Sequence, residues 1–179
     1  MNAPAPLLMA PIVGVVPARF EPTKSLFELK SGAVLEGGDR WREEGRRFGL
    51  FGVDACPRQT VYCDRAGTRR DGAEASLAVL AGYIADRKPV CAQFVQSAGT
   101  VLISRPAMIG SDRPDLANLQ NTSGFAFARL DGRGLPDHAL YAVAAQVAWE
   151  KKAGLRQFDD VEHPAILRDQ GMAGRETMP

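Results

Sequence analysis

The sequence predicts an α+β domain, and three observations lead to this prediction. Residues 37–57 carry the glycines and the alternation of polar and apolar residues that are typical of a β-hairpin. Two later segments, 73–85 and 137–153, carry apolar residues at helical spacing. Short apolar runs that are typical of strands occur at 90–95, 100–104 and 125–130. A chain of 179 residues is long enough to bury a core around these elements as one domain.

The composition is that of a globular protein with nearly balanced charge. Apolar residues make up 45% of the chain and charged residues 24%, which are the proportions of an ordinary soluble fold. Lysine and arginine total 22 against 21 for aspartate and glutamate, whereas nucleic-acid-binding proteins usually carry a clear positive excess. Three cysteines cannot form a complete set of disulfides, so they favour the cytoplasm or another reducing compartment.

Residues 1–26 are expected to form an extended N-terminal arm. They are rich in alanine and proline and lack the basic start of a secretory signal peptide. The apolar run at 11–17 is broken by prolines and is too short to cross a bilayer. We therefore predict neither a signal peptide nor a membrane span here, and we interpret 12–16 as a strand that pairs with another segment.

Two aspartates mark the ends of the predicted hairpin. A glycine pair before Asp39 supplies the positive φ of a tight turn, and Gly45 can do the same at the hairpin tip. Asp39 begins the first strand, and Asp54 ends the second strand, which is expected to span 48–53. Because a hairpin folds these two positions back together, both carboxylates could face one hard cation.

The first helix has the clearest boundaries in the chain. Asp71 stands in the N-cap position and Glu74 follows three residues later, which is the spacing of a capping box. Apolar residues then recur every three or four positions, and Pro89 ends the pattern. The sequence therefore predicts a helix that buries one face against the strands.

The second half of the chain is predicted to hold an insertion, a second helix and a tail. Residues 105–123 are interrupted by proline and glycine and are expected to be irregular. Asp137 is expected to cap a second helix that ends at Ala153. The face that this helix should bury comprises Leu140, Val143, Ala144 and Val147. Residues 157–179 are polar and are expected to be an extended tail, with a short helix at 164–170 as the alternative.

The hairpin resembles that of the staphylococcal nuclease-like (thermonuclease) family. Its members carry a D-G-D-T stretch, a hairpin and then R-L-x-G-I-D-A-P-E. The equivalents in this chain are Gly37-Gly38-Asp39-Arg40-Trp41 and Gly49-Leu50-Phe51-Gly52-Val53-Asp54-Ala55-Cys56-Pro57. The resemblance covers residues 27–156 and is weakest at 97–124. It implies a small five-stranded OB-fold-like β-barrel with two to three helices, in which Trp41 is a core residue.

The resemblance also implies a site from which several chemical groups have been lost. Asp39 and Asp54 match the family's metal-binding aspartates and would be a vestigial metal site. The family's phosphate-contacting arginine is replaced by Gly49, and its glutamate, the base or water-positioning group, is replaced by Pro57. A second family arginine corresponds to Thr122 or Ser123. Phosphodiester hydrolysis needs a metal, a positioned water and cationic donors, so the enzyme reading is not favoured.

Three functions follow from these observations. The first is a catalytically degenerate nuclease-like domain without a cofactor, which acts as an interaction or structural subunit of a larger assembly. Its partner proteins would dock on the N- and C-terminal arms, because such arms are commonly ordered only by a partner.

The two alternatives both involve nucleic acid. One is a calcium- or magnesium-dependent endonuclease for DNA or RNA that uses Asp39 and Asp54, with Glu36, Glu43 or Glu44 as a substitute base. The other is nucleic-acid binding without hydrolysis, through Trp41 and the four arginines of the hairpin. These arginines are Arg40, Arg42, Arg46 and Arg47. A solvated face interleaved with acidic residues is the favoured interpretation of this cluster.

Overall fold

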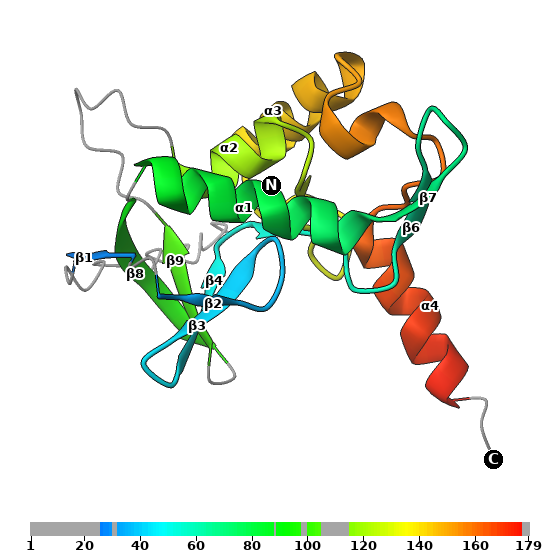
Figure 1. Cartoon of the computed structure of the whole chain (residues 1–179). Coiled ribbons are helices and arrows are strands. Elements are labelled where there is room, and N and C mark those ends of the chain that lie inside the picture. The colour runs from blue at the N-terminus through cyan, green and yellow to red at the C-terminus, as the bar shows by residue number, and fades with distance from the viewer. Residues whose placement is uncertain (1–25, 30–31, 88, 98–99, 105–114, 177–179) are drawn as a thin grey trace, which may run out of the picture.

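The computed structural model describes residues 26–29, 32–87, 89–97, 100–104 and 115–176. It is a mixed α+β structure, as the sequence predicts (Figure 1). The largest sheet has six strands in the order β1-β8-β9-β4-β3-β2. These strands are β1 (Leu26–Glu28), β2 (Val34–Leu35), β3 (Arg40–Glu43), β4 (Arg46–Leu50), β8 (Val90–Ser97) and β9 (Thr100–Ser104). All its neighbouring strands are antiparallel except β4 and β9, which are parallel.

Two small sheets and the helices complete the domain. β5 (Val53–Asp54) pairs with β10 (Phe127–Ala128), and β6 (Val61–Cys63) pairs with β7 (Arg69–Asp71). The α-helices are α1 (Gly72–Arg87), α2 (Leu116–Thr122), α3 (Ala139–Glu150) and α4 (Pro164–Glu176), with a 3-10 turn η1 (Gly154–Gln157). In Figure 1, α1 lies across the large sheet, and α4 extends away from the rest of the chain.

The expected five-stranded closed barrel is not confirmed. In the described residues no strand pairing closes the large sheet, whose outermost strands are β1 and β2. These two strands are nevertheless consecutive in the chain: β1 pairs with β8 at one end, and β2 pairs with β3 at the other. The segment 26–35 therefore contributes strands to both ends of the sheet.

The predicted hairpin is confirmed, but its second strand is shorter than expected. β3 and β4 pair in an antiparallel register that places Trp41 opposite Phe48. At the tip, Glu44 and Gly45 have φ values of 48° and 77°, the pair of positive angles that a two-residue turn needs. The prediction of one strand up to Val53 is wrong. β4 ends at Leu50, and the chain turns before it enters β5.

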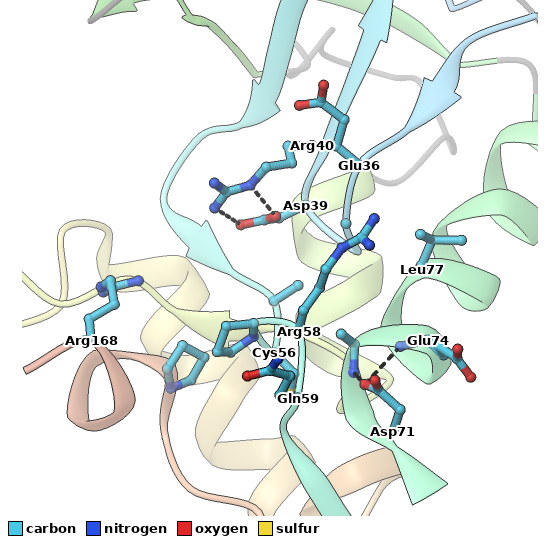
Figure 2. A pocket seen from close by; sticks show the side chains of 15 residues that line it. Glu36, Asp39, Arg40, Cys56, Arg58, Gln59, Asp71, Glu74, Leu77 and Arg168 are labelled. Carbon is cyan, nitrogen blue, oxygen red and sulfur yellow. Dashed lines mark hydrogen bonds and ion pairs between the residues drawn. The ribbon is translucent and has the colours of Figure 1, made fainter. Parts of the chain in front are cut away.

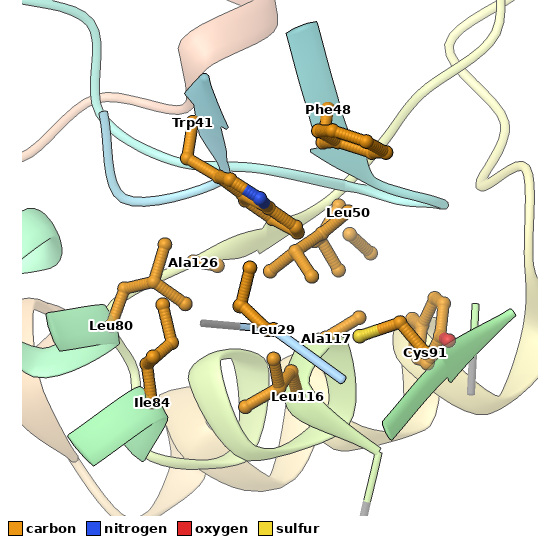
Figure 3. Packing of buried hydrophobic residues seen from close by; sticks show 13 residues of the cluster. Leu29, Trp41, Phe48, Leu50, Leu80, Ile84, Cys91, Leu116, Ala117 and Ala126 are labelled. Atoms are coloured by element: carbon orange, nitrogen blue, oxygen red, sulfur yellow. The ribbon is translucent and has the colours of Figure 1, made fainter. Parts of the chain in front are cut away.

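The hydrophobic core lies between the hairpin, α1 and α2 (Figure 3). Trp41 is fully buried, as predicted, and its ring stacks on Phe48 at 5.8 Å between centroids. Leu80 and Ile84 of α1 and Leu116 of α2 pack into the same cluster. Burial of such side chains contributes about 1.5–3 kcal/mol each to folding, so this cluster fixes α1 and α2 relative to the sheet.

The first helix confirms the predicted cap. The Asp71 carboxylate accepts hydrogen bonds from the backbone N–H groups of Ala73, at 2.7 Å, and Glu74, at 3.4 Å. The helix runs from Gly72 to Arg87 and ends before Pro89. An N-terminal cap of this kind typically stabilises a helix by about 1 kcal/mol.

The predicted irregular insertion is wrong for its last third. Residues 105–114 lie outside the described part of the chain, but Leu116–Thr122 form α2, and this helix is largely buried. Gln120 and Asn121 are fully buried, and the side-chain amide nitrogen of each has carbonyl partners. Gln120 donates to the carbonyl oxygens of Gly38 and Ser76, and Asn121 donates to that of Tyr141.

The second predicted helix exists, but its cap and its buried face differ from the prediction. His138 rather than Asp137 is the N-cap residue, and no side chain caps the first turn. α3 buries Tyr141, Ala144 and Ala148. Of the apolar residues expected inside, Leu140 is 71% exposed and Val143 is 63% exposed. Trp149, on a third side of the helix, is 63% exposed as well.

Two glycines allow the chain to cross itself closely after α2 and α3. Gly124 and Gly154 have φ values of 79° and 53°, and Leu155 donates its N–H to the Gly124 carbonyl at 3.1 Å. A Cβ atom on Gly124 would lie 2.0 Å from the carbonyl oxygen of Ala153. Glycine is therefore required at this crossing for both its conformation and its size.

The structure tests the prediction for the C-terminal segment but not that for most of the N-terminal segment. The N-terminal arm predicted for 1–26, including the strand at 12–16, lies outside the described residues except for Leu26 in β1. At the other end, the expectation of an extended chain is wrong for Pro164–Glu176, which form α4. The helical alternative at 164–170 is confirmed, and the helix is longer than predicted.

Candidate functional site

A pocket of about 880 Å³ lies where the start of the hairpin meets α1 and α4 (Figure 2). Its lining comes from four segments: residues 36–40, the loop 55–59, the first turns of α1, and the start of α4. Three guanidinium groups and four carboxyl groups line it. They belong to Arg40, Arg58, Arg168, Glu36, Asp39, Asp71 and Glu74. Nearly half of the lining residues are therefore charged, and several of them are already paired within the chain.

Asp39 is held at the pocket by its neighbour Arg40. The carboxylate is 4% exposed and accepts two hydrogen bonds from Arg40, from Nε at 2.9 Å and from Nη2 at 3.1 Å. This hydrogen-bonded pair raises the pKa of Arg40, with smaller attractions from Asp54 and Glu36, while burial opposes the rise. The bidentate geometry is the strongest arrangement of an arginine and a carboxylate.

The backbone before Asp39 is fixed by close packing. A Cβ atom on Gly38 would lie 2.4 Å from the Ser76 Cβ atom and 2.9 Å from the Ala55 Cβ atom. The expectation that the glycine pair before Asp39 supplies positive φ is wrong, because neither Gly37 nor Gly38 has a positive φ. Gly38 is needed here for its size. The close approach of this loop to α1 places Asp39 in the lining of the pocket.

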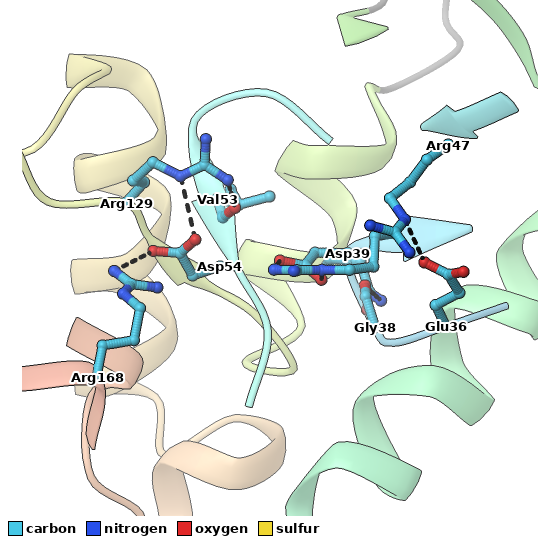
Figure 4. Close-up of polar contacts among 10 residues, drawn as sticks. Glu36, Gly38, Asp39, Arg47, Val53, Asp54, Arg129 and Arg168 are labelled. Carbon is cyan, nitrogen blue, oxygen red and sulfur yellow. Dashed lines mark hydrogen bonds and ion pairs between the residues drawn. The ribbon is translucent and has the colours of Figure 1, made fainter. Parts of the chain in front are cut away.

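Asp54 lies on a different sheet and has two arginine partners (Figure 4). The carboxylate is 3% exposed; Arg129 Nε donates to Oδ1 at 3.1 Å, and Arg168 Nη2 donates to Oδ2 at 2.9 Å. Arg129 also donates to the backbone carbonyl of Val53 at 3.0 Å. Arg129 follows β10 and Arg168 belongs to α4, so three separate elements meet at this carboxylate.

The two aspartates of the predicted metal site are therefore both occupied by guanidinium groups. Each of their four carboxylate oxygens accepts an arginine N–H. Asp39 lines the pocket, whereas Asp54 lies behind Arg168 and does not line it. Among the residues that the structure describes, no group of three or more His, Cys, Asp or Glu side chains is arranged to hold a metal ion.

The four hairpin arginines of the nucleic-acid alternative are engaged within the hairpin. Arg42 and Arg47 both form ion pairs with Glu36, each at 3.0 Å. The guanidinium of Arg46 lies over the Phe48 ring at 5.3 Å, and Arg40 pairs with Asp39. These contacts match the interpretation of a solvated face with interleaved acidic residues.

The three glutamates proposed as substitute bases in the nuclease alternative lie in different places. Desolvation tends to raise the pKa of Glu36, but Arg42 and Arg47 outweigh it and hold the pKa below its usual value. Glu36 lines the pocket, whereas Glu43 and Glu44 lie at the hairpin tip and are not part of the pocket lining. A carboxylate held by two arginines is a poor proton acceptor at neutral pH.

The positions that the resemblance equates with the family's other catalytic groups offer no replacement. Gly49 is buried on β4 opposite Arg40. Pro57 lines the pocket but has no group that can accept a proton. Thr122 and Ser123 lie at the end of α2, where the Ser123 hydroxyl donates to the Gln120 carbonyl. The nearest cations to the two aspartates are instead Arg40, Arg129 and Arg168.

Sequence reasoning missed Arg58, Arg129 and Arg168. Arg58 follows Pro57 directly and lines the pocket with the loop 55–59. Arg129 is at the end of a predicted strand that pairs beside Asp54. No local signal marks Arg168, because its contact with Asp54 spans 114 positions of the sequence.

The three cysteines are thiols, in accord with the prediction that they form no disulfide framework. Cys56 and Cys91 are buried and Cys63 is exposed. Burial raises the pKa of the Cys56 thiol to about 11, although the Arg156 charge and a hydrogen bond with Ser76 act in the opposite direction. A thiol with this pKa is almost fully protonated at neutral pH and is a weak nucleophile.

Comparison with models of known protein families gives no match for this chain, and no curated protein compared with it is significantly similar. None of the helices in the described residues combines the length and the apolarity that a bilayer crossing requires.

Proposed function

We propose that this chain is a nuclease-like domain of the OB type that has no phosphodiesterase activity and acts as an interaction subunit of a protein assembly. The strand arrangement supports the fold part of the proposal. β1 and β2, which stand at opposite ends of the large sheet, are consecutive strands of the chain, so the two edges of the sheet are close in sequence. The hairpin followed by a helix across the sheet is the order that the family resemblance implies.

The main support for a loss of activity is that arginines occupy both aspartates. A metal-dependent phosphodiesterase needs carboxylate oxygens for the metal, a positioned water, and cations directed at the phosphate. Here the four oxygens of Asp39 and Asp54 accept N–H groups of Arg40, Arg129 and Arg168. The three arginines neutralise the two carboxylates, so they lower the attraction of the site for a cation and are themselves less able to stabilise a phosphate.

The exposed apolar residues on and beside α3 support the interaction part of the proposal. Leu140, Val143 and Trp149 are each more than 60% exposed, and Leu135 in the preceding loop is 53% exposed. Large apolar residues that gather on one exposed element are typical of protein contact surfaces. This surface lies on α3, whereas the sequence pointed to the terminal arms as docking segments.

The loss of activity is tested with a fluorogenic single-stranded DNA substrate in calcium or magnesium. We expect no metal-dependent turnover by the wild type, by Pro57→Glu or by Asp54→Ala. Restoring one group does not restore the others, and catalytic groups of this kind act as a unit. Asp86→Asn, an exposed substitution in α1, is the control for handling and purity. Metal-dependent turnover by the wild type that is lost in Asp54→Ala would contradict the proposal.

The interaction role is tested by recovering the protein from its native source under mild conditions. We expect a partner protein to co-purify with the wild type and with Ala142→Ser, and to be lost from the double variant Leu140→Ser, Val143→Ser. Both altered side chains are exposed, so the fold should be retained, and circular dichroism checks this. Equal recovery of partners by all three proteins would exclude α3 as the contact surface.

A further inference from the structure

His163 precedes α4; one ring nitrogen caps the first turn of this helix, and the other joins the start of the helix to β10. Nδ1 lies 3.1 Å from the backbone nitrogen of Ala165, and Nε2 lies 3.1 Å from the carbonyl oxygen of Ala128 in β10. A backbone N–H can only donate, so Nδ1 must accept. Nε2 must then carry the hydrogen that is donated to the Ala128 carbonyl. Both contacts can therefore exist together only when the imidazole is neutral.

The same part of α4 forms a side of the pocket. Pro164 is fully buried, and both Pro164 and Arg168 line the pocket. Arg168 also donates to Asp54 on β5, and the His163 ring packs edge-on against Phe127 at 5.1 Å. Beyond these residues α4 extends away from the domain (Figure 1). In the described residues, the contacts that attach α4 to the rest of the domain therefore lie in its first two turns.

The charges around the His163 ring come from three elements. Arg156 of η1 and Arg168 of α4 are cationic, and Asp54 of β5 is anionic. Burial lowers the pKa of His163 below 6.5; the two arginines lower it further, while the Ala128 hydrogen bond and Asp54 raise it. A proton on Nδ1 would turn the acceptor for the Ala165 N–H into a second donor, and would place a third cation among these groups.

We propose that the contact of α4 with the β5–β10 pair is a pH-sensitive switch, in which protonation of His163 releases the first turns of α4 and opens the pocket. The direction of the pH effect on docking follows from the linkage between proton binding and release of the helix. The released state binds the proton more readily than the docked state, so docking is fully stable above about pH 6.5 and weakens as pH falls toward the lowered pKa. The switch stands on these contacts and does not depend on the proposed function.

Amide hydrogen exchange in the full chain tests this inference. We expect the protection of the Ala165–Arg168 amides, corrected for intrinsic exchange, to fall by up to about tenfold per pH unit below pH 6.5. Amides of α1 such as that of Leu80 should keep their protection over the same range, which separates local release from acid unfolding. Unchanged protection at Ala165–Arg168 between pH 7.5 and pH 5 would overturn the proposal.

Two variants identify the titrating group. In His163→Asn the side-chain oxygen can still accept the Ala165 N–H, because asparagine is a favoured N-cap residue, but it does not titrate. We expect the pH dependence of exchange to disappear in this variant. His138→Asn changes the other histidine of the chain and should keep the dependence. The same pH dependence in His163→Asn as in the wild type would show that another group is responsible.

If His163→Asn does not fold, the protonation state of His163 can be measured directly in the wild-type protein. Nitrogen-15 NMR of the imidazole distinguishes the two neutral tautomers and the protonated ring. We expect His163 at pH 7.5 to be neutral with the hydrogen on Nε2, and to change together with the Ala165–Arg168 amides as pH falls. A ring that carries its hydrogen on Nδ1, or that is protonated at pH 7.5, would overturn the inference.

Discussion

Replacing Gly124 by alanine is expected to lower the free energy of unfolding by more than about 3 kcal/mol. The left-handed conformation, with φ of 79°, costs an L-residue roughly 1–2 kcal/mol. The added Cβ atom would also lie 2.0 Å from the Ala153 carbonyl oxygen. Because that atom is backbone, the two crossing segments must separate and lose the hydrogen bond from Leu155 to Gly124. Urea denaturation measures the change.

Two other glycines separate the causes of this loss. Gly134 has nearly the same φ, 78°, but open space around its Cβ position. Gly134→Ala should therefore cost only the conformational part, about 1–2 kcal/mol. Gly82, inside α1, has ordinary φ and open space, so Gly82→Ala should stabilise the protein by about 0.5–1 kcal/mol. A cost for Gly124→Ala no larger than that for Gly134→Ala would contradict the close crossing.

Asp54→Asn is expected to lower the free energy of unfolding by roughly 2–4 kcal/mol. The substitution keeps the size of the side chain but removes the charge that two arginines share. Arg129, whose side chain is 25% exposed, would lose most, since it is less hydrated than Arg168 at 46%. Denaturation at pH 7 and low salt measures the change.

A double-mutant cycle tests whether the ion pair with α4 is the cause. Arg168→Gln should weaken the protein less than Asp54→Asn, and the two changes together should cost less than their sum because they remove the same contact. Asp86→Asn, on the exposed end of α1, should change stability by less than about 0.5 kcal/mol. Additive effects of Asp54→Asn and Arg168→Gln would show that the two residues do not interact.

Elements that depend on local sequence could be predicted, whereas long-range pairs could not. The cap of α1 follows from Asp71 and Glu74, which lie three positions apart, and the hairpin turn follows from Gly45. α2 was missed because Gln120 and Asn121 look like loop residues. Their burial depends on the carbonyl oxygens of Gly38 and Tyr141, and the first of these lies 82 positions away.

The buried face of α3 shows a different limit of sequence reasoning. Apolar residues occur on three sides of this helix, so periodicity does not identify a single buried stripe. Of the stripe predicted from Leu140, Val143, Ala144 and Val147, Ala144 is buried as expected, but Leu140 and Val143 are exposed. Tyr141 and Ala148 complete the buried face instead. Small side chains allow α3 to pack closely, and the larger Leu140 and Val143 remain on the surface.

The candidate site shows the same division, because its two carboxylates were predicted from local sequence and their partners were not. Asp39 and Asp54 were recognised from their spacing, and both are buried at or beside the pocket. Their partners were not foreseen. Arg40 was considered only within the arginine cluster of the hairpin although it is adjacent to Asp39, and Arg168 belongs to a segment for which an extended tail was expected, with a short helix as the alternative. A sequence pattern identifies carboxylates more easily than it identifies the cations that neutralise them.

The contact between Asp54 and Arg168 also has a consequence for synthesis on the ribosome. The two residues are 114 positions apart, and translation proceeds at about 5–20 residues per second. Arg168 is therefore made roughly 6 to 23 seconds after Asp54. The hairpin and α1 can form during that interval, because they pair residues close in sequence, but the Asp54 carboxylate lacks one of its two cations. The nascent domain thus passes through a period in which its sheet is assembled and its pocket is still incomplete.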